Sequence, residues 1–223
     1  MGCLGALLGA AIGKQGDLKD KLKGRTPEQQ KVIKYFAGEG GCLSKGLTDA
    51  EYDDMIRAVI NGTNWKQKAL DKIGLDEDQL REIDPINFEG YYFDEKKTYA
   101  KYGADKKWRS SAYQISWLFF SADQVYLYQY TFNMDEEGKK EHTEEYFYKD
   151  ITNFSTTSDT VEKEVPEVSG CNNNVEYVMK SVDYTRFALV VPGDKLYCSM
   201  DQSDEYEAAI QGMKAKLREK KNA

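Results

Sequence analysis

The 223-residue chain contains one histidine, four prolines and four cysteines, and each scarcity argues against a class of protein. The single histidine, His142, rules out most histidine-based metal sites and weakens any case for a Ser-His-Asp triad. Four prolines leave no room for long proline-rich linkers. The cysteines (Cys3, Cys42, Cys171 and Cys198) form no CxxC pair, so we expect no zinc site.

Scattered cysteines in a chain of this size are typical of free thiols in a reducing compartment. We therefore expect a cytoplasmic protein, with peripheral contact to the inner face of the membrane as the alternative. A bridge between Cys171 and Cys198 is the other option for the thiols, since both flank the same predicted strands.

An excess of basic charge is also absent, because the net charge is −7. Phosphate backbones require a basic footprint, so we expect no nucleic-acid partner. The chain contains no GxSxG, Walker, GxGxxG or HExxH motif. Its carboxylates occur at predicted helix starts and turns, where solvation explains them. We expect no catalytic activity, no cofactor and no metal; an unrecognised enzyme is the remaining alternative.

No hydrophobic run is long enough to cross a bilayer, which takes roughly 20 residues. The N-terminal stretch MGCLGALLGAAIGK also lacks the basic start of a secretory signal. Gly5, Gly9 and Gly13 repeat every fourth residue, a spacing that lets two helices approach closely. We interpret residues 1–25 as a glycine-rich arm and basic linker resting on the domain. Shallow membrane insertion or self-association into a homo-oligomer is the alternative.

Residues 26–85 carry the start and stop signals of a helical domain. Thr26 precedes Pro27 and Gln29, and Thr48 precedes Glu51, and both patterns are typical of helix starts. The predicted helices begin near Pro27, Asp49, Trp65 and Asp76 and end near Gly38, Asn61, Ile73 and Ile83. Helices this short are not stable alone, so we expect them to pack on each other or on a neighbour.

Residues 86–223 are predicted to form a β domain centred on two aromatic runs, Tyr113–Phe120 and Gln124–Phe132. The short polar connection between them predicts a hairpin. In the second run Val125 and Leu127 alternate with Tyr126 and Tyr128, so the two sets lie on opposite faces of a sheet. Further strands are predicted at 87–93, 144–154, 159–165, 174–181, 184–191 and 195–199. The apolar stripe Tyr206, Ala209, Ile210, Met213 and Leu217 predicts a closing amphipathic helix.

The fold class is therefore α+β, with short N-terminal helices followed by an antiparallel barrel or sandwich. Three stretches, EEYFYKDITNFSTT, WLFFSADQVYLY and SDEYEAAIQGMKAKL, resemble bacterial pleckstrin-homology-like (PH-like) domains. The resemblance covers residues 87–221 and implies a barrel closed by the C-terminal helix. It also implies binding to lipid headgroups or peptides, or scaffolding, and no catalysis.

A basic loop interrupts this acidic chain. Residues 96–109 (KKTYAKYGADKKWR) hold six cations and one carboxylate, a net charge of +5. Such clustering creates a local potential that attracts anions. In lipid-binding PH domains the matching loop carries a lysine, a spacer and a basic-x-Arg pattern, which this loop resembles. The candidate anion- or lipid-binding residues are Lys97, Lys101, Lys106, Lys107, Trp108 and Arg109. The alternative is a solvated loop that keeps the protein soluble.

Taken together, the sequence predicts a non-enzymatic binding or scaffold module that interacts with an unknown protein partner. The alternative is a peripheral membrane protein that uses the basic loop and the N-terminal arm on an anionic surface.

Overall fold

The computed structural model describes residues 18–38, 46–76, 78, 80, 83–94, 98–169, 174–201 and 204–222. The helices are α2 (Pro27–Phe36), α3 (Asp49–Asn61), α4 (Trp65–Ile73), the 3-10 turn η2 (Tyr148–Asp150) and α5 (Asp204–Asn222). The strands are β1 (Ile86–Tyr92), β2 (Ala100–Tyr102), β3 (Trp108–Ser110), β4 (Ala112–Phe120), β5 (Gln124–Asn133), β6 (Lys139–Phe147), β7 (Asn153–Ser169), β8 (Asn174–Val191) and β9 (Asp194–Ser199). The α+β class is confirmed, and the pairings between these strands are antiparallel.

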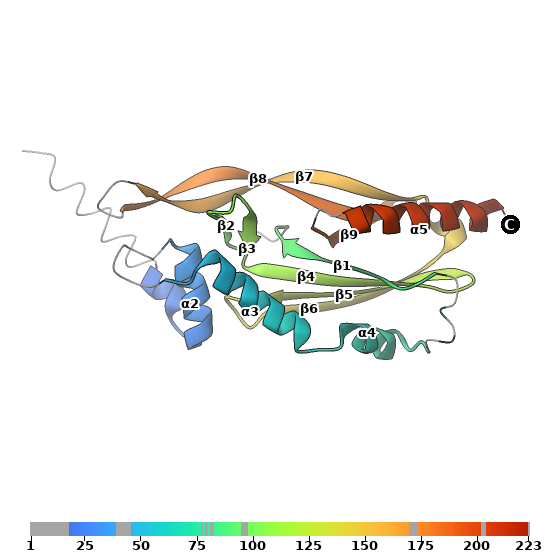
Figure 1. The fold of residues 1–223 in the computed structure, drawn as a ribbon, viewed down its shortest axis with the longest axis horizontal. Helices are drawn as coiled ribbons and strands as arrows, with labels where there is room; N and C mark the ends of the chain where they lie inside the picture. Colours follow the sequence, from blue (N-terminus) through green and yellow to red (C-terminus); the bar gives the residue numbers. More distant parts are fainter. Residues whose placement is uncertain are drawn as a thin grey trace, which may run out of the picture.

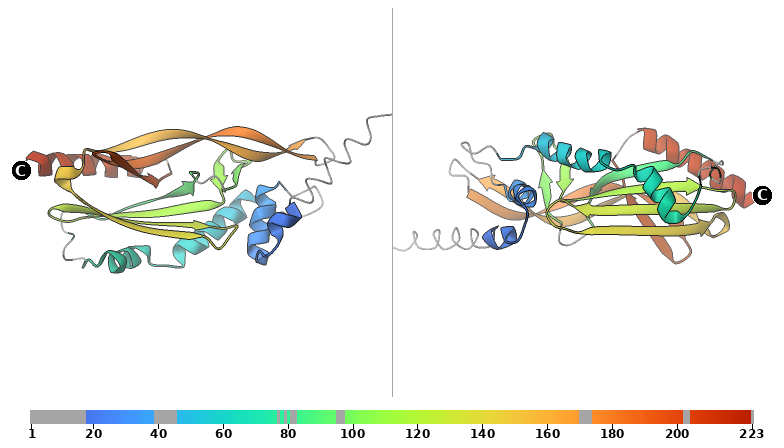
Figure 2. Two further views of the ribbon diagram at one scale, coloured as in Figure 1. Left: turned by 180° about the vertical axis from the view of Figure 1, so that it is seen from behind. Right: turned by 90° about the horizontal axis from the view of Figure 1, so that it is seen from below.

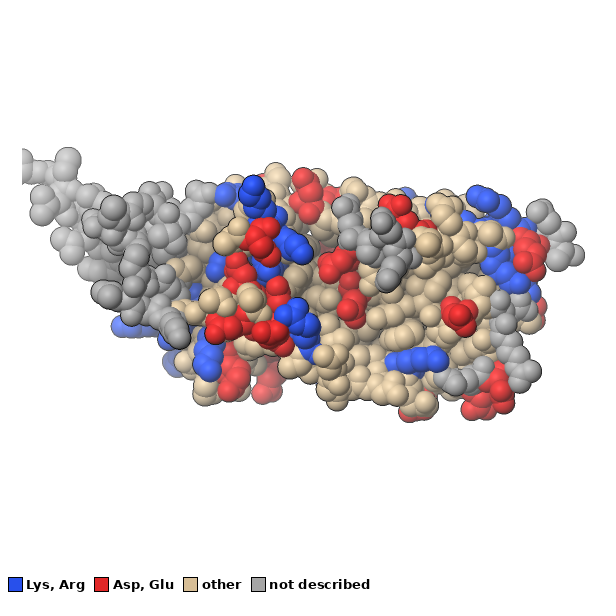
Figure 3. Space-filling view, viewed as in Figure 1, with Lys and Arg blue, Asp and Glu red and all other residues tan. Residues whose placement is uncertain are grey.

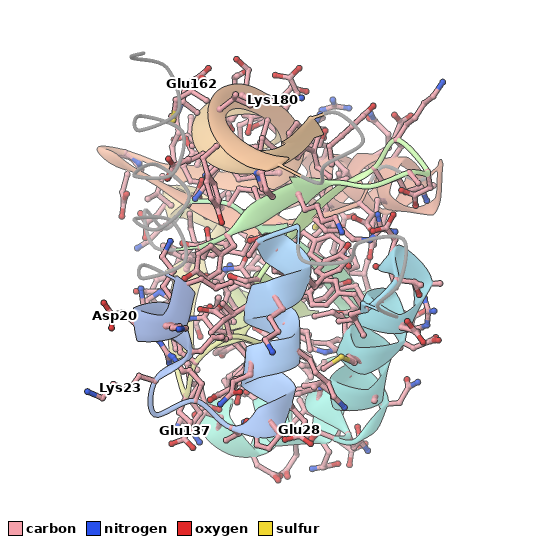
Figure 4. All side chains as sticks on the ribbon, turned by 90° about the vertical axis from the view of Figure 1, so that its left-hand side faces the viewer. Asp20, Lys23, Glu28, Glu137, Glu162 and Lys180 are labelled. Carbon is pink, nitrogen blue, oxygen red and sulfur yellow. The ribbon has the colours of Figure 1, made fainter. Side chains whose placement is uncertain are left out.

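The elements stack in layers around a four-stranded sheet with the order β1-β4-β5-β6. Helices α2, α3 and α4 cover one face of this sheet, and the β7-β8-β9 sheet with α5 lies across the other (Figures 1 and 2). Viewed along the long axis, the β7–β8 ribbon is at one extreme, with Glu162 and Lys180 on its outer side (Figure 4). Helices α2 and α3 stand at the other extreme, so the central sheet is enclosed between them.

The helical layer forms where the sequence predicts it, because the capping signals are satisfied. The hydroxyls of Thr26 and Thr48 accept hydrogen bonds from the backbone at the third helical position, completing both capping boxes. Helix α4 ends at Gly74, which adopts the left-handed conformation that glycine tolerates best. The buried faces of these helices share one apolar cluster with the aromatic face of the sheet.

The predicted alternation of β5 is confirmed. Tyr126 and Tyr128 lie in the cluster beneath the helices, whereas Val125 and Leu127 lie in a second cluster on the opposite face. The helices therefore pack on one set of β5 side chains, and the second sheet packs on the other set. The predicted hairpin is also formed, with Phe120 opposite Val125 next to the turn.

The second cluster joins the two sheets and buries the apolar stripe of α5. Ile210, Met213 and Leu217 pack there against Phe88 and Phe187, which confirms the core-facing prediction for this helix. A polar seam crosses the same interface, linking the central sheet to β9. The Gln129 amide donates to the Tyr197 carbonyl at 2.8 Å, and the Ser199 N–H donates to Gln114 Oε1 at 2.8 Å.

The sheets do not close into a barrel, which corrects the barrel expectation. The chain leaves β6 through η2, where Tyr148 is buried, and β7 then begins in the other sheet. The predicted strand over 144–154 is split by this turn. Strands β7 and β8 also run uninterrupted for 17 and 18 residues, where two shorter strands are predicted in place of β8.

Several predictions fall outside the described residues. The glycine arm (Gly5, Gly9 and Gly13), Lys97 and half of the predicted helix Asp76–Ile83 belong to this group. No helix within the described ranges is long and apolar enough to cross a membrane.

Candidate functional site

A groove of about 860 Å³ opens beside β1. Its walls come from α3, β1, the β2–β3 hairpin, β4, the middle of the β7–β8 ribbon and the segment Met200–Asp201. The volume lies within the range of sites that hold a small molecule or part of a peptide. Acidic and basic side chains are interleaved on the surface over α3 and the β2–β3 hairpin (Figure 3).

Arg109 is the most constrained residue of the predicted basic site. Its residue is only 2% exposed, and its guanidinium donates to both oxygens of Asp53 at 2.7 Å. It also donates to Asp105 at 2.8 and 2.9 Å. These two carboxylates raise the pKa of Arg109 above its ordinary value. The donors that the expected phosphate clamp would use are thus engaged within the fold, and anion binding at Arg109 stays a prediction.

Lys101 is also committed to an internal contact. Its ammonium lies 3.6 Å from the ring centre of Tyr35 and 3.7 Å from a carboxylate oxygen of Asp49. Asp49 in turn accepts from the Tyr35 hydroxyl at 2.7 Å and from the backbone N–H of Ala104 at 2.8 Å. These contacts fasten the β2–β3 hairpin to α2 and α3, and they point Lys101 away from the groove lining.

The close packing of the β2–β3 hairpin on these groups requires a glycine at position 103. A methyl group at its Cα would lie 2.4 Å from Arg109 Nη1 and 2.6 Å from Asp105 Oδ1. Both atoms belong to the ion-pair network, so they are not free to move aside at low cost.

The same contacts lower the pKa of two carboxyl groups on α3. Burial alone would raise the pKa of Asp53, but the hydrogen bonds from Arg109 and Tyr91 outweigh it and hold the pKa below its ordinary value. Asp49 shows the same balance: burial raises its pKa, and the hydrogen bond from Tyr35 contributes to a net lowering. Both groups are thus ionised and structural at neutral pH.

The remaining residues of the predicted site lie at the exposed hairpin tip. Lys106 and Lys107 are exposed, and Trp108 packs against Tyr102, whose ring centre is 4.9 Å away. Lys106, Lys107, Trp108 and Arg109 all line the groove, so the structure does bring these four predicted residues together.

Sequence reasoning missed the acidic side of the groove. Glu89 on β1 and Asp201 after β9 line it together, and the Asp201 N–H donates to the Glu89 carbonyl at 3.2 Å. Neither residue carries a recognisable motif, and they are more than a hundred positions apart. Only the packing of the segment after β9 against β1 makes them neighbours.

Comparison with known proteins provides no further assignment: no family model, curated protein or solved structure matches the chain.

Proposed function

We propose that the protein is a non-enzymatic interaction module that binds a partner protein in the groove beside β1. The observation that carries the proposal is the groove itself, a concave surface lined by charged and aromatic side chains from several parts of the fold. Interfaces favour aromatic anchors surrounded by polar groups, and Trp108, Tyr91 and Tyr184 supply such anchors here.

The resemblance to bacterial PH-like domains supports the same proposal. The order of antiparallel strands followed by one terminal helix agrees with that family, and its known roles are in binding and scaffolding. The protein differs from that family in having two stacked sheets in place of a barrel.

The test compares the partners that the wild type and a variant with a blocked groove capture from native lysate. Ser158 is exposed and lines the groove, so Ser158→Trp fills part of it. Thr156 is exposed at the equivalent position two residues earlier on β7 and is not part of the lining, so Thr156→Trp is the matched control. The proposal expects a captured protein that is lost with Ser158→Trp and kept with Thr156→Trp. Equal capture by both variants would exclude the groove as the binding site of the partner.

A second candidate function follows from the hairpin tip. Tyr102 is 49% exposed beside Trp108, and Lys106 and Lys107 have no ion-pair partner among the described residues. Interfacial aromatics beside lysines suit an anionic lipid surface. The proposal expects flotation with phosphatidylserine vesicles to fall for Lys106→Glu/Lys107→Glu.

The control for this second candidate places the same charge change elsewhere. Lys31 and Lys34 are exposed on α2, so Lys31→Glu/Lys34→Glu should float as the wild type does. Arg109 is left intact, because replacing it disturbs the fold. A wild-type protein that does not float, or two variants that float equally poorly, would contradict binding through the hairpin.

A further inference from the structure

The groove beside β1 has an acidic wall without a cation to balance it. Glu89 and Asp201 form no salt bridge within the described part of the chain. Two other carboxylates of the lining have partners within the fold: Asp53 pairs with Arg109, and Asp183 accepts a hydrogen bond from the Thr160 hydroxyl at 2.7 Å. Glu89 and Asp201 differ from Asp53, which the fold uses in its own ion-pair network.

Asp201 is exposed, so water screens much of its charge. Its pKa is nevertheless raised, by partial desolvation and by the neighbouring charge of Glu89. The charge of Lys107 acts in the opposite direction. A cation placed against Glu89 and Asp201 would relieve both effects, whereas an anion in the same position would add to them.

Aromatic rings next to these carboxylates suit a long basic side chain. Tyr91 and Tyr113 line the groove beside Glu89, and Met200 lies beside Asp201. Lysine and arginine bury their aliphatic stems on such surfaces while their charged ends reach a carboxylate. Rings nearby also attract the cation itself.

The backbone of β1 points to a peptide as the carrier of that side chain. Strand β1 is the outer strand of its sheet, and among the described strands none pairs with its other edge. The Glu89 carbonyl faces this edge, because it accepts from the Asp201 N–H. Since peptide groups alternate along a strand, the groups of Tyr91, two residues on, face the same way. The Glu89 carbonyl is already used by Asp201, so an extended segment can add its hydrogen bonds at Tyr91.

We propose that the groove binds an extended segment of a partner protein that places a lysine or arginine between Glu89 and Asp201. This inference rests on the proposed function and specifies its ligand. The exposed lysines at the hairpin end of the groove, Lys106 and Lys107, disfavour a uniformly basic segment. One basic side chain within an otherwise neutral or acidic segment is the chemistry that fits.

The probe is an array of octapeptides, randomised except at one central position fixed as Lys, Arg, Gln or Glu. The full-length protein should retain the Lys and Arg sets more strongly than the Gln and Glu sets. A charge-assisted contact with partly exposed carboxylates is worth up to roughly a 10-fold difference in affinity. The best octapeptide, N-methylated at alternate positions, should lose binding if backbone hydrogen bonds contribute.

The variant Glu89→Gln/Asp201→Asn should lose the preference for Lys and Arg while keeping the fold. The control Glu145→Gln/Asp150→Asn removes two exposed carboxylates outside the groove lining, and it should keep the preference. Absence of a preference in the wild type, or a preference that survives Glu89→Gln/Asp201→Asn, would overturn the inference.

The two proposals fail separately. If Ser158→Trp abolishes lysate capture but Glu89→Gln/Asp201→Asn does not, the groove binds a partner without the basic side chain. If neither variant changes capture, the proposed function itself fails.

Discussion

At the scale of single residues, Arg109 shows why a basic loop is a poor guide to an anion site. The guanidinium of a basic-x-Arg pattern can donate two parallel hydrogen bonds to a phosphate, but it pairs with a carboxylate equally well. Asp53, one helical turn after Asp49, is the partner that the fold provides. The sequence places both charges, but only the docking of α3 on the sheet shows that they meet.

Arg109→Met is expected to destabilise the protein by about 3 kcal/mol, because it leaves Asp53 and Asp105 without their shared partner. Lys106→Met, at an exposed position nearby, should change the free energy of unfolding by less than about 0.5 kcal/mol. Urea denaturation of both variants measures the difference. Equal stability of the two variants would mean that the network contributes nothing to the fold.

Two glycines are expected to respond to alanine with opposite signs. Gly103→Ala places a methyl group against Arg109 and Asp105 and should cost roughly 1–3 kcal/mol. Gly212→Ala in α5 meets no atom within 4 Å and should stabilise the helix by roughly 0.5–1 kcal/mol. Thermal unfolding distinguishes them, and a stabilising Gly103→Ala would contradict the close packing of the hairpin.

Asp53 and Asp201 predict opposite dependences of stability on pH. The folded pKa of Asp53 is lowered, so its contribution is present above about 3.8 and is lost as pH falls through the folded pKa. The folded pKa of Asp201 is raised by partial desolvation, with Glu89 and Asp53 adding and Lys107 opposing. Because Asp201 is exposed, solvent screening keeps its penalty small. The penalty is present at neutral pH and disappears as pH falls towards about 3.8.

At pH 7, Asp53→Asn should therefore unfold at lower urea than the wild type, and Asp201→Asn at slightly higher urea. Both differences should shrink as the pH is lowered to about 3. A gap between Asp201→Asn and the wild type that widens in acid would show that the carboxyl is not destabilising in the folded state.

At the scale of elements, the helices and the aromatic hairpin were predictable because their signals are local. Capping boxes, a terminal glycine and alternating side chains each act over a few residues. The long β7–β8 ribbon was not, because polar residues such as Asp159 and Glu162 interrupt its hydrophobic pattern. Those residues find partners across the ribbon or beside it: Asp159 pairs with Arg186 at 2.7 Å.

Helix α5 gives a prediction at this scale. Met213 is fully buried between the sheets, so Met213→Ala should cost about 2–5 kcal/mol through lost contacts and the remaining cavity. Gln211→Ala, on the exposed face of the same helix, should have little effect. Guanidinium denaturation followed by circular dichroism measures both. Similar stability for the two variants would mean that α5 is not part of the core.

At the scale of the whole molecule, the division into a helical domain (26–85) and a β domain (86–223) stays a prediction. Trp65 of α4 packs against Tyr130 of β5 with ring centres 4.6 Å apart, and Tyr52 of α3 donates to the Ser110 carbonyl at 2.7 Å. Contacts of this kind couple the two regions energetically.

We therefore expect one cooperative unfolding transition for the described regions together. Tryptophan fluorescence and far-ultraviolet circular dichroism should give coincident curves in urea. Deletion of residues 26–84 should expose the aromatic face of the sheet and yield an insoluble product. Two separate transitions, or a soluble and folded deletion variant, would show that the helices form an independent domain.

The hydrogen bonds that Gln114 and Gln129 make with β9 fix the position of that strand along its length. If β9 slipped by a single residue, both glutamine side chains would lose their backbone partners inside the protein, and Cys198 would turn from the interior towards water. An extra residue inserted at the Pro192–Gly193 bend should accordingly bulge outward at the bend, leaving the strand where it is.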